Sequence, residues 1–420
     1  MKTLVPQIVT SSTLRSARRG LAAVRRRLNL SRPVVRYFHQ VDDPYSALAA
    51  RALPHLEAVW GARVIPYIVP PPDTAAAPDA QRLAGWSLRD ARTLAEGLGM
   101  EASFTSAPSA ELLARAQAAL AGIRDATVFS AISSAIERGF RTGKASAIPL
   151  SDSDARAALA RGAGARRGHY LGGMFQFEGE WYWGLDRLPY LEDRLARIRP
   201  GGVRFTERRE VRLEARKAPA GTVIEAFVSL RSPYTYIAIP RLRALADVTG
   251  AELRLRPVLP MVMRGLPVPL AKRLYIMRDT KREAERLGLP FGKVSDPVGA
   301  PVERGLAVLF AAMDQGKGAD FLYSFLRGVF AEGIDAGSDQ GLEMLSRRAG
   351  IPAAAMHAAL ADESWREKAE GNRAAMLEAG LWGVPSFRVN NLPAHWGQDR
   401  LWAVEQDLFA ASAGSTRGTS

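Results

Sequence analysis

The chain contains no cysteine among its 420 residues. This absence excludes disulfide frameworks, cysteine-based zinc sites and any dithiol redox chemistry of the chain's own. The five histidines show no spacing typical of metal ligands, so the sequence predicts no metal site. It also lacks the run of roughly 18 apolar residues that a membrane span requires. A hydrophobic fraction of 47% and a charged fraction of 24% indicate a soluble globular protein.

Acidic residues number 43 against 57 lysines and arginines, and the formal net charge is +14. Residues 1–31 contain no acid and carry six arginines: Arg15, Arg18, Arg19, Arg25, Arg26 and Arg27. This balance favours anionic partners such as nucleic acid, acidic lipid headgroups or small carboxylates, although a general preference for arginine on solvated helix faces explains it as well. No nucleic-acid motif accompanies the charge, so no nucleic-acid partner is predicted. The first segment resembles a transit peptide in composition, but a basic N-terminal arm of a cytoplasmic protein is the more economical interpretation.

A strand, a turn and a helix in the second half form the centre of the sequence. Val223–Val228 is rich in β-branched and aromatic residues, which predicts a strand. Ser232 and Pro233 then supply a helix N-cap and first helical residue, and apolar residues at helical spacing continue to a stop at Gly250. A second strand is expected over 252–259. This order predicts a thioredoxin-type βαβ unit.

The same stretch resembles a known family. Its layout is similar to a DsbA-like thioredoxin domain, in which a Cys-Pro-His-Cys turn stands where this chain has Ser232-Pro233-Tyr234-Thr235. The serine version resembles 2-hydroxychromene-2-carboxylate isomerases and kappa-class glutathione transferases. The resemblance continues in Gly-Val-Pro-Ser-Phe at 383–387, similar to the family's cis-proline loop, and in Trp-Gly-Gln-Asp-Arg at 396–400. The two motifs in this order are fairly specific, and the match covers roughly residues 222–410.

The first half repeats this order of motifs. A predicted strand at 34–39 leads into Asp43-Pro44-Tyr45-Ser46, and Trp-Gly-Leu-Asp-Arg at 183–187 parallels the later Trp-Gly-Gln-Asp-Arg. The simplest inference is a tandem duplication. Asp43 replaces Ser232 in this copy, and Gly172-Gly173 replaces Val384-Pro385. A carboxylate would oppose a thiolate beside it, so we expect the first copy to be inactive.

The predicted fold class is α/β, with two tandem thioredoxin-like domains of DsbA type, each carrying a helical insertion. Helical spacing predicts insertion helices over 268–289, 303–315, 318–331 and 338–349 and a further helix over 364–380. The expected organisation is a basic arm at 1–31, a degenerate domain at 32–199, a linker at 200–221, the domain with the site at 222–412 and a flexible tail at 413–420. Alternating residues at 203–213 suggest an edge strand within the linker.

The resemblance implies a glutathione site. Ser232 would donate a hydrogen bond to the glutathione sulfur, and a helix N-terminus and a hydroxyl both favour the thiolate. Val384, before a cis Pro385, would pair with the cysteinyl segment of glutathione. Gln398 and Asp399 would hold its γ-glutamyl end, and Tyr234 would contact the substrate. Ser232 and Asp399 are also ordinary helix-start residues, so a purely structural role stays open for each.

The resemblance therefore implies a glutathione-dependent isomerase or transferase that acts on a small aromatic-degradation intermediate. The family usually has an asparagine in the helical insertion, and residues 301–305 of this chain contain none, so the chain departs from the family pattern there. The alternative is a non-catalytic thioredoxin-like scaffold that binds an anionic protein or lipid. Because the related single-domain enzymes are dimers, we expect the two halves to form an internal pseudo-dimer, in a chain that is monomeric or homodimeric.

Overall fold

The computed structural model describes residues 4–410 except residues 103 and 105, and the predicted tail at 413–420 lies outside this range. The chain divides into two compact units. Unit 1 combines Met1–Leu14 with Glu210–Ser420, and unit 2 is Arg15–Arg209. Each unit has its own sheet and its own hydrophobic core.

Unit 1 contains a four-stranded sheet in the order β6-β5-β7-β8. The strands are β5 (Val223–Val228), β6 (Glu252–Pro257), β7 (Ser386–Val389) and β8 (His395–Trp396). β5 is parallel to β6 and antiparallel to β7, which is antiparallel to β8. Five of the six side chains of β5 are buried, which agrees with the apolar, β-branched sequence that predicted this strand.

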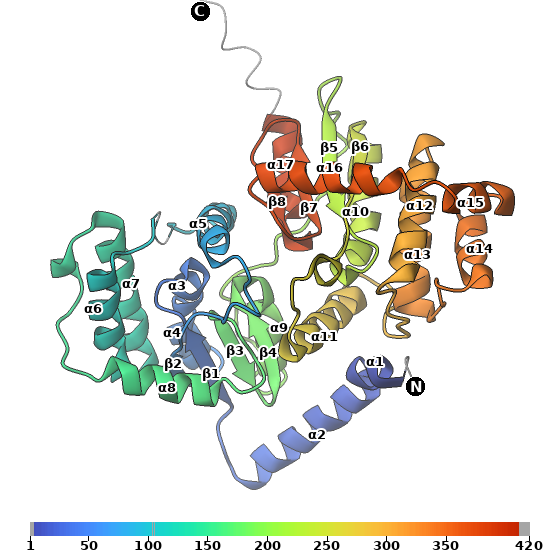
Figure 1. The fold of residues 1–420 in the computed structure, drawn as a ribbon. Coiled ribbons are helices and arrows are strands. Elements are labelled where there is room, and N and C mark those ends of the chain that lie inside the picture. The colour runs from blue at the N-terminus through green and yellow to red at the C-terminus, as the bar shows by residue number, and fades with distance from the viewer. Residues whose placement is uncertain (1–3, 103, 105, 411–420) are drawn as a thin grey trace, which may run out of the picture. The chain divides into compact units, whose positions relative to one another are not determined.

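Some helices of unit 1 pack on this sheet, and others form a group to one side of it (Figure 1). Together they are α1 (Leu4–Val9), α10 (Pro233–Thr249), α11 (Leu270–Arg286), α12 (Ala300–Asp314), α13 (Gly318–Arg327), α14 (Asp339–Arg348), α15 (Ala353–Leu360), α16 (Trp365–Glu378) and α17 (Leu401–Ala410). Short turns of 3₁₀ helix at Met261–Arg264 and Gln398–Arg400 and of π-helix at Gly328–Glu332 complete the unit. The predicted insertion helices are confirmed, and α15 is an addition that the sequence did not reveal.

Unit 2 repeats the strand order, as β2-β1-β3-β4. Its strands are β1 (Val34–His39), β2 (Arg63–Ile68), β3 (Met174–Phe177) and β4 (Glu180–Trp183). β1 is parallel to β2 and antiparallel to β3, and β3 is antiparallel to β4, so the strand directions also repeat. The two sheets therefore share both the order and the directions of their strands.

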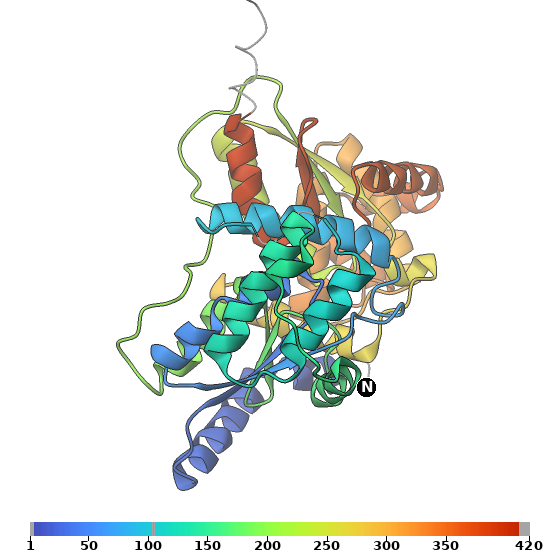
Figure 2. The same ribbon diagram turned by 90° about the vertical axis from the view of Figure 1, so that its left-hand side faces the viewer.

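The helices of unit 2 differ in number and length from those of unit 1. They are α3 (Pro44–Ala50), α4 (Leu53–Ala58), α5 (Ala80–Gly97), α6 (Ala110–Ala121), α7 (Ala126–Thr142), α8 (Ala155–Ala165) and α9 (Gly184–Ala196), with a 3₁₀ turn at Ala145–Ala147. Figure 2 shows α5, α6 and α7 in blue-green to teal. The predicted basic arm contains α2 (Ser12–Leu28), which belongs to unit 2 from Arg15 onward.

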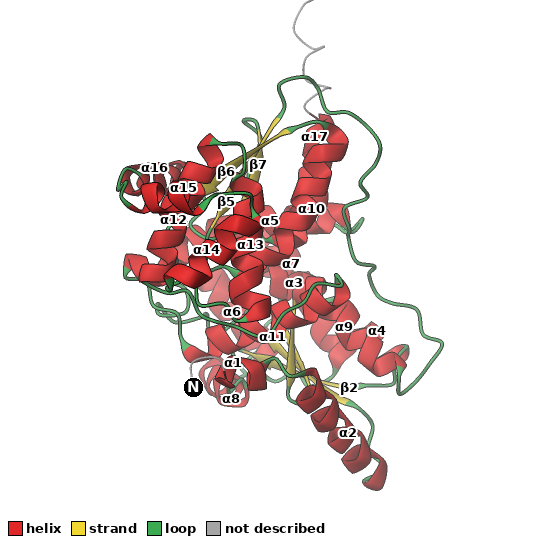
Figure 3. Ribbon diagram, turned by 90° about the vertical axis from the view of Figure 1, so that its right-hand side faces the viewer, coloured by secondary structure: helices red, strands yellow, loops and turns green. Residues whose placement is uncertain are grey.

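The segment between the last helix of unit 2 and β5, residues 197–222, contains no strand. Figure 3 shows it as a long green loop. The predicted edge strand at 203–213 is therefore wrong. The amide groups of Arg212 and Leu213 donate instead to the carboxylate of Glu405, at 2.8 and 2.7 Å. A side chain thus satisfies the backbone groups that a neighbouring strand would otherwise bond. Within the described residues, no helix is both long and apolar enough to cross a bilayer.

Candidate functional site

Ser232 lies at the N-cap of α10, where the sequence predicts it. Its hydroxyl oxygen accepts a hydrogen bond from the backbone N–H of Thr235 at 3.1 Å, and the hydroxyl donates to the carbonyl oxygen of Val384 at 3.4 Å. The side chain is 8% exposed. The fold therefore brings the start of α10 and the proline loop together, although 152 residues separate them in the chain.

The other hydroxyl groups of the Ser-Pro-Tyr-Thr turn point elsewhere. Thr235 is fully buried, and its hydroxyl has no hydrogen-bond partner among the described residues. The Tyr234 hydroxyl donates to Asp279 of α11 at 2.8 Å, and Arg282 contacts the same carboxylate at 3.3 Å. Ser232 is thus the turn residue whose hydroxyl contacts the proline loop. Tyr234, predicted to contact the substrate, is held by the helical insertion.

The Val384–Pro385 peptide bond is cis, as the sequence predicts. The loop is fixed from both sides: the Ser386 hydroxyl donates to the Gly383 carbonyl at 2.7 Å, and the Gly397 N–H donates to the Pro385 carbonyl at 2.8 Å. The Trp396 ring lies directly over Gly383, and the β-carbon of any larger residue at this position would overlap the ring. The Gly-Val-Pro-Ser and Trp-Gly motifs therefore form one packed unit.

Gln398 and Asp399 are adjacent to the same loop in sequence, but protein partners already occupy the Gln398 amide. Arg241 of α10 donates to its oxygen, and its nitrogen donates to Asp399 at 2.5 Å and to Glu283 of α11 at 3.3 Å. Gln398 is 2% exposed and Asp399 is half-buried. Burial lowers the pKa of Arg241, and the nearby Arg286 adds to that shift. In this structure Gln398 holds Asp399 in place.

Two further residues that could have faced a substrate have partners inside unit 1. Arg231 makes a two-pronged ion pair with Asp296 at 2.6 and 2.7 Å. The His395 ring lies 2.8 Å from the carboxylate of Asp407. A carboxylate of unit 1 therefore holds each of these two side chains.

The sequence analysis did not single out the partners that α11 supplies. Asp279, Arg282, Glu283 and Arg286 form a charged stripe on α11, with ion pairs Asp279–Arg282 at 3.3 Å and Glu283–Arg286 at 2.9 Å. Their i, i+3, i+4, i+7 spacing puts them on one helix face and is readable in the sequence. A buried Asp279 at 1% exposure and Glu283 at 2% then identify this face as internal.

The corresponding place in unit 2 has different chemistry. Asp43 caps α3 as Ser232 caps α10, and its carboxylate accepts bonds from the N–H and hydroxyl of Ser46 at 2.9 and 2.6 Å. Burial raises the pKa of Asp43 to about 6, against the opposing effect of the Ser46 hydrogen bonds. The carboxylate is committed to its own helix, as expected for a cap.

Sheet register identifies the loop of unit 2 that corresponds to the proline loop. Met174 pairs with Phe38 as Ser386 pairs with Phe227, so Gly173 stands where Pro385 stands in unit 1. A side-chain carbon on Gly172 would lie 2.5 Å from Gln40 and 2.8 Å from the Ser46 hydroxyl. The glycine loop thus lies against the start of α3, leaving no room for a larger residue.

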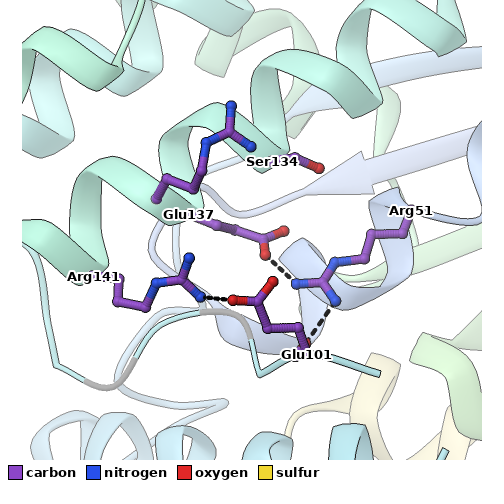
Figure 4. A pocket seen from close by; sticks show the side chains of 6 residues that line it. Arg51, Glu101, Ser134, Glu137 and Arg141 are labelled. Carbon is purple, nitrogen blue, oxygen red and sulfur yellow. Dashed lines mark hydrogen bonds and ion pairs between the residues drawn. The ribbon is translucent and has the colours of Figure 1, made fainter. Parts of the chain in front are cut away.

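Unit 2 also contains a cavity of about 260 Å³ (Figure 4). The residues that line it are Arg51, Glu101, Ser134, Glu137, Arg138 and Arg141, none of which the sequence had singled out. Arg51 bonds Glu137 and the backbone oxygen of Glu101, and Arg141 bonds the Glu101 carboxylate. Burial raises the pKa of Glu137, against the opposing effect of Arg51. These arginines already neutralise the carboxylates. The polar residues around the cavity therefore serve to join α7 to its neighbours through ion pairs and hydrogen bonds.

Among the residues that the structure describes, no group of three or more His, Asp or Glu side chains is placed to hold a metal ion. The groups that the structure places around Ser232 are its hydroxyl, the Val384 carbonyl and the N-terminus of α10. These groups can hold a small thiol or a peptide-like ligand, and they include no strong base.

The chain is similar to several solved structures over about half of its length. No curated protein matches the chain. A solved 2-hydroxychromene-2-carboxylate isomerase is similar at 21% identity and a TM-score of 0.40, over 47% of this chain and 100% of its own. The cytosolic disulfide reductase DsbM from Pseudomonas aeruginosa is similar at 24% identity and 0.36, over 47% and 100%. A probable DsbA oxidoreductase from Streptomyces coelicolor is similar at 20% identity and 0.36, over 47% and 92%.

The family model of the DSBA-like thioredoxin domain matches residues 223–409. This segment runs from β5 to α17 and includes Ser232, the cis-proline loop and Gln398-Asp399. The model matches this one segment only, so it does not extend to the predicted duplicate in unit 2. Residues 223–409 therefore form a DsbA-like thioredoxin domain.

Proposed function

We propose that unit 1 binds glutathione at Ser232 and uses its thiolate to isomerise a small conjugated aromatic-degradation intermediate, as 2-hydroxychromene-2-carboxylate isomerases do, or to transfer the thiol to an electrophile. We further propose that the protein works in the cytoplasm, where glutathione keeps thiols reduced. The chain has no cysteine, so an external thiol must supply the sulfur.

One observation carries this proposal: the Ser232 hydroxyl lies between the N-terminus of α10 and the Val384 carbonyl. A thiolate near this hydroxyl would be stabilised by the helix dipole and by an O–H donor. The Val384 backbone would pair with a peptide-like ligand as an added strand does. At 3.4 Å the present bond from Ser232 to Val384 is long, so the hydroxyl loses little when it turns toward a sulfur atom.

The proposed reaction needs no other reactant. The thiolate adds to an electrophilic carbon of the conjugated substrate, and the adjacent double bond becomes a single bond. Rotation about that bond follows, and loss of the thiolate restores the double bond in the other geometry. In the transferase version a leaving group departs from the electrophile, and the thioether stays as product.

A second candidate is a thioredoxin-like domain that binds a partner without catalysis. This candidate is favoured because the polar groups of Tyr234 and Gln398 already have partners within the protein. Tyr234 donates to Asp279, and Gln398 accepts from Arg241. A catalytic site in which Gln398 contacts glutathione would require these bonds to exchange. Asp399 therefore carries the proposed contact with the γ-glutamyl ammonium group, while Gln398 positions it.

Calorimetric titration with glutathione tests the proposal on the full chain. We expect micromolar-to-millimolar binding that Asp399→Ala abolishes, because the substitution removes the proposed charge-assisted hydrogen bond to the γ-glutamyl ammonium group. Ser232→Ala should leave binding within a few-fold but raise the pKa of the bound thiol. Since the protein has no thiol of its own, the thiolate absorbance comes from glutathione, and a titration of free glutathione supplies the reference from which the bound form is separated.

Ser338→Ala is the matched control, because Ser338 caps α14 of the same unit through a bond to Gly341 at 3.1 Å. Both serine variants should lose similar stability, and only Ser232→Ala should change the thiol pKa. An absence of glutathione binding at several millimolar would exclude the glutathione enzyme. Binding without turnover of chromene or halo-aromatic substrates would support the non-catalytic alternative.

A further inference from the structure

Helix α2 is a basic helix whose chemistry the proposed site does not use. It contains no acidic residue, and none of its side chains is fully buried. Figure 2 shows it in dark blue, extending beyond the other helices of unit 2. Its two faces differ in what they contact.

The inner face attaches to unit 2 through charge. Arg19 makes a two-pronged ion pair with Glu180 at 2.6 and 2.7 Å, and Arg26 pairs with Glu178. Arg194 of α9 also pairs with Glu178, so this acidic turn between β3 and β4 is anchored to the core of the unit. Arginine therefore occupies the face where an amphipathic helix ordinarily buries apolar residues.

The outer face carries an apolar stripe. Leu14, Leu21, Val24 and Leu28 are 42%, 52%, 51% and 78% exposed. Their spacing of seven, three and four residues puts them along one side of the helix. Single exposed leucines are ordinary on a protein surface, but four in line on one helix form a contiguous patch.

Three arginines stand beside this stripe without partners. Arg18, Arg25 and Arg27 are exposed, and none of them has an ion-pair partner among the described residues. Arg18 and Arg25 are seven residues apart and lie on the same side as the stripe. The outer face thus combines exposed apolar side chains with positive charge that no acid of the chain neutralises.

We propose that α2 docks on an anionic lipid surface. The apolar stripe enters the boundary between headgroups and acyl chains, and Arg18, Arg25 and Arg27 contact lipid phosphates while the helix lies in the plane of the interface. A nucleic acid would satisfy the arginines but leave the leucines in water. The Arg19 and Arg26 ion pairs hold unit 2 to the opposite face, so docking requires no rearrangement of that unit.

Vesicle co-sedimentation of the full chain tests this proposal, with vesicles of phosphatidylcholine alone and of phosphatidylcholine with phosphatidylglycerol. We expect binding to the anionic vesicles only, weakened by salt. Leu21→Glu with Leu28→Glu should reduce the affinity at least about tenfold, because buried apolar area is lost. Converting Arg18, Arg25 and Arg27 to Gln should reduce it on the order of a hundredfold.

Controls of equal chemistry lie elsewhere in unit 2. Leu150→Glu changes a leucine that is 83% exposed, and Arg156, Arg161 and Arg167 converted to Gln remove the same charge from exposed positions in and after α8. Both controls should bind like the wild type. The proposal fails if the wild type does not bind anionic vesicles at low salt, or if the arginine control weakens binding equally. It also fails if light scattering shows a dimer that Leu21→Glu dissociates in a chain that binds no vesicles.

Discussion

At the scale of single residues, Ser232 combines a helix cap with access to the cis-proline loop. The chain has no other thiol, so a cysteine placed here can be titrated by itself. We predict that the Ser232→Cys thiol has a pKa of about 7 or below, because the N-terminus of α10 favours the thiolate. Thiolate absorbance against pH measures it.

Ser338→Cys is the control for this substitution, since Ser338 caps the exposed start of α14. Its pKa should lie closer to the ordinary value of about 8.5. Equal pKa values in the two variants would mean that the surroundings of Ser232 stabilise a thiolate no more than the N-terminus of an exposed helix does.

A second residue-scale prediction concerns Glu225 in β5. Burial would raise the pKa of this carboxyl, but bonds from Arg388 and Arg256 outweigh it and lower the pKa. We expect Glu225→Gln to destabilise unit 1 by about 3 kcal/mol near neutral pH, because two arginines lose their common partner. Denaturant unfolding followed by hydrogen exchange in β5, β6 and β7 measures this loss.

The sign of the pH effect at Glu225 follows from its lowered pKa. The ion pairs stabilise the folded state above the unfolded pKa of the carboxyl, and this stability is lost as the pH falls through the folded pKa. The difference between wild type and Glu225→Gln should therefore shrink in acid. A difference that stays constant down to pH values where carboxylates are protonated would contradict this account.

At the scale of elements, the packing of Trp396 on Gly383 fixes the shape of the proline loop. We predict that Gly383→Ala displaces the loop and costs about 2 kcal/mol, since the added methyl group overlaps a ring that has little space to move. Glutathione binding should fall in parallel. Gly371→Ala, within α16 and with no atom near its added carbon, should instead stabilise unit 1 by about 1 kcal/mol.

Thermal unfolding and calorimetry of these two variants compare the same chemical change in two places. Loss of stability in Gly371→Ala, or unchanged glutathione binding in Gly383→Ala, would contradict the account of the loop. The comparison separates a packing effect from the general effect of adding a methyl group.

At the scale of the whole molecule, the two sheets share a strand order but only one carries the proposed site. We predict that glutathione binds with a stoichiometry of one per chain, because Asp43 is bonded to its own helix and Gly172 lies against Gln40 and Ser46. Calorimetry measures the stoichiometry directly. A second site that survives Asp399→Ala would contradict the prediction. The internal pseudo-dimer stays a prediction, which small-angle scattering can test.

The stability of unit 2 should depend on pH through Glu192. Burial raises the pKa of this carboxyl to about 7, although Phe205 and Trp60 donate to it at 2.9 and 3.0 Å. A raised carboxyl pKa favours folding below the unfolded pKa, and this contribution is lost as the pH rises through about 7. In the wild type, Glu192 should make the free energy of unfolding of unit 2 larger in acid than in base by on the order of 3 kcal/mol. We expect Glu192→Gln to remove this difference.

Hydrogen exchange of peptides from unit 2 at two pH values measures this effect. Asp43 and Glu137 shift in the same direction as Glu192, but both are unchanged in the variant, so the comparison with wild type isolates Glu192. An identical pH dependence in the two proteins would exclude Glu192 as the cause.

The sequence by itself determined the features that depend on neighbouring residues. β5 was predicted because it is rich in β-branched and aromatic residues. The two ends of α10 were predicted because Ser232 and Pro233 act on the first turn of the helix and Gly250 on its last turn. The insertion helices followed from a period of 3.6 residues. The cis state of Val384–Pro385 followed from the family resemblance rather than from local physics.

Only the tertiary structure decided which side chains meet. Alternation at 203–213 suggested a strand, but Glu405 takes the amide groups of that segment, and α15 is too short and rich in alanine to show a period. The bonds from Tyr234 to Asp279 and from Arg241 to Gln398 join residues 45 and 157 positions apart. Such pairs depend on how helices pack against a sheet, and a pattern within one segment carries no information about a partner in another.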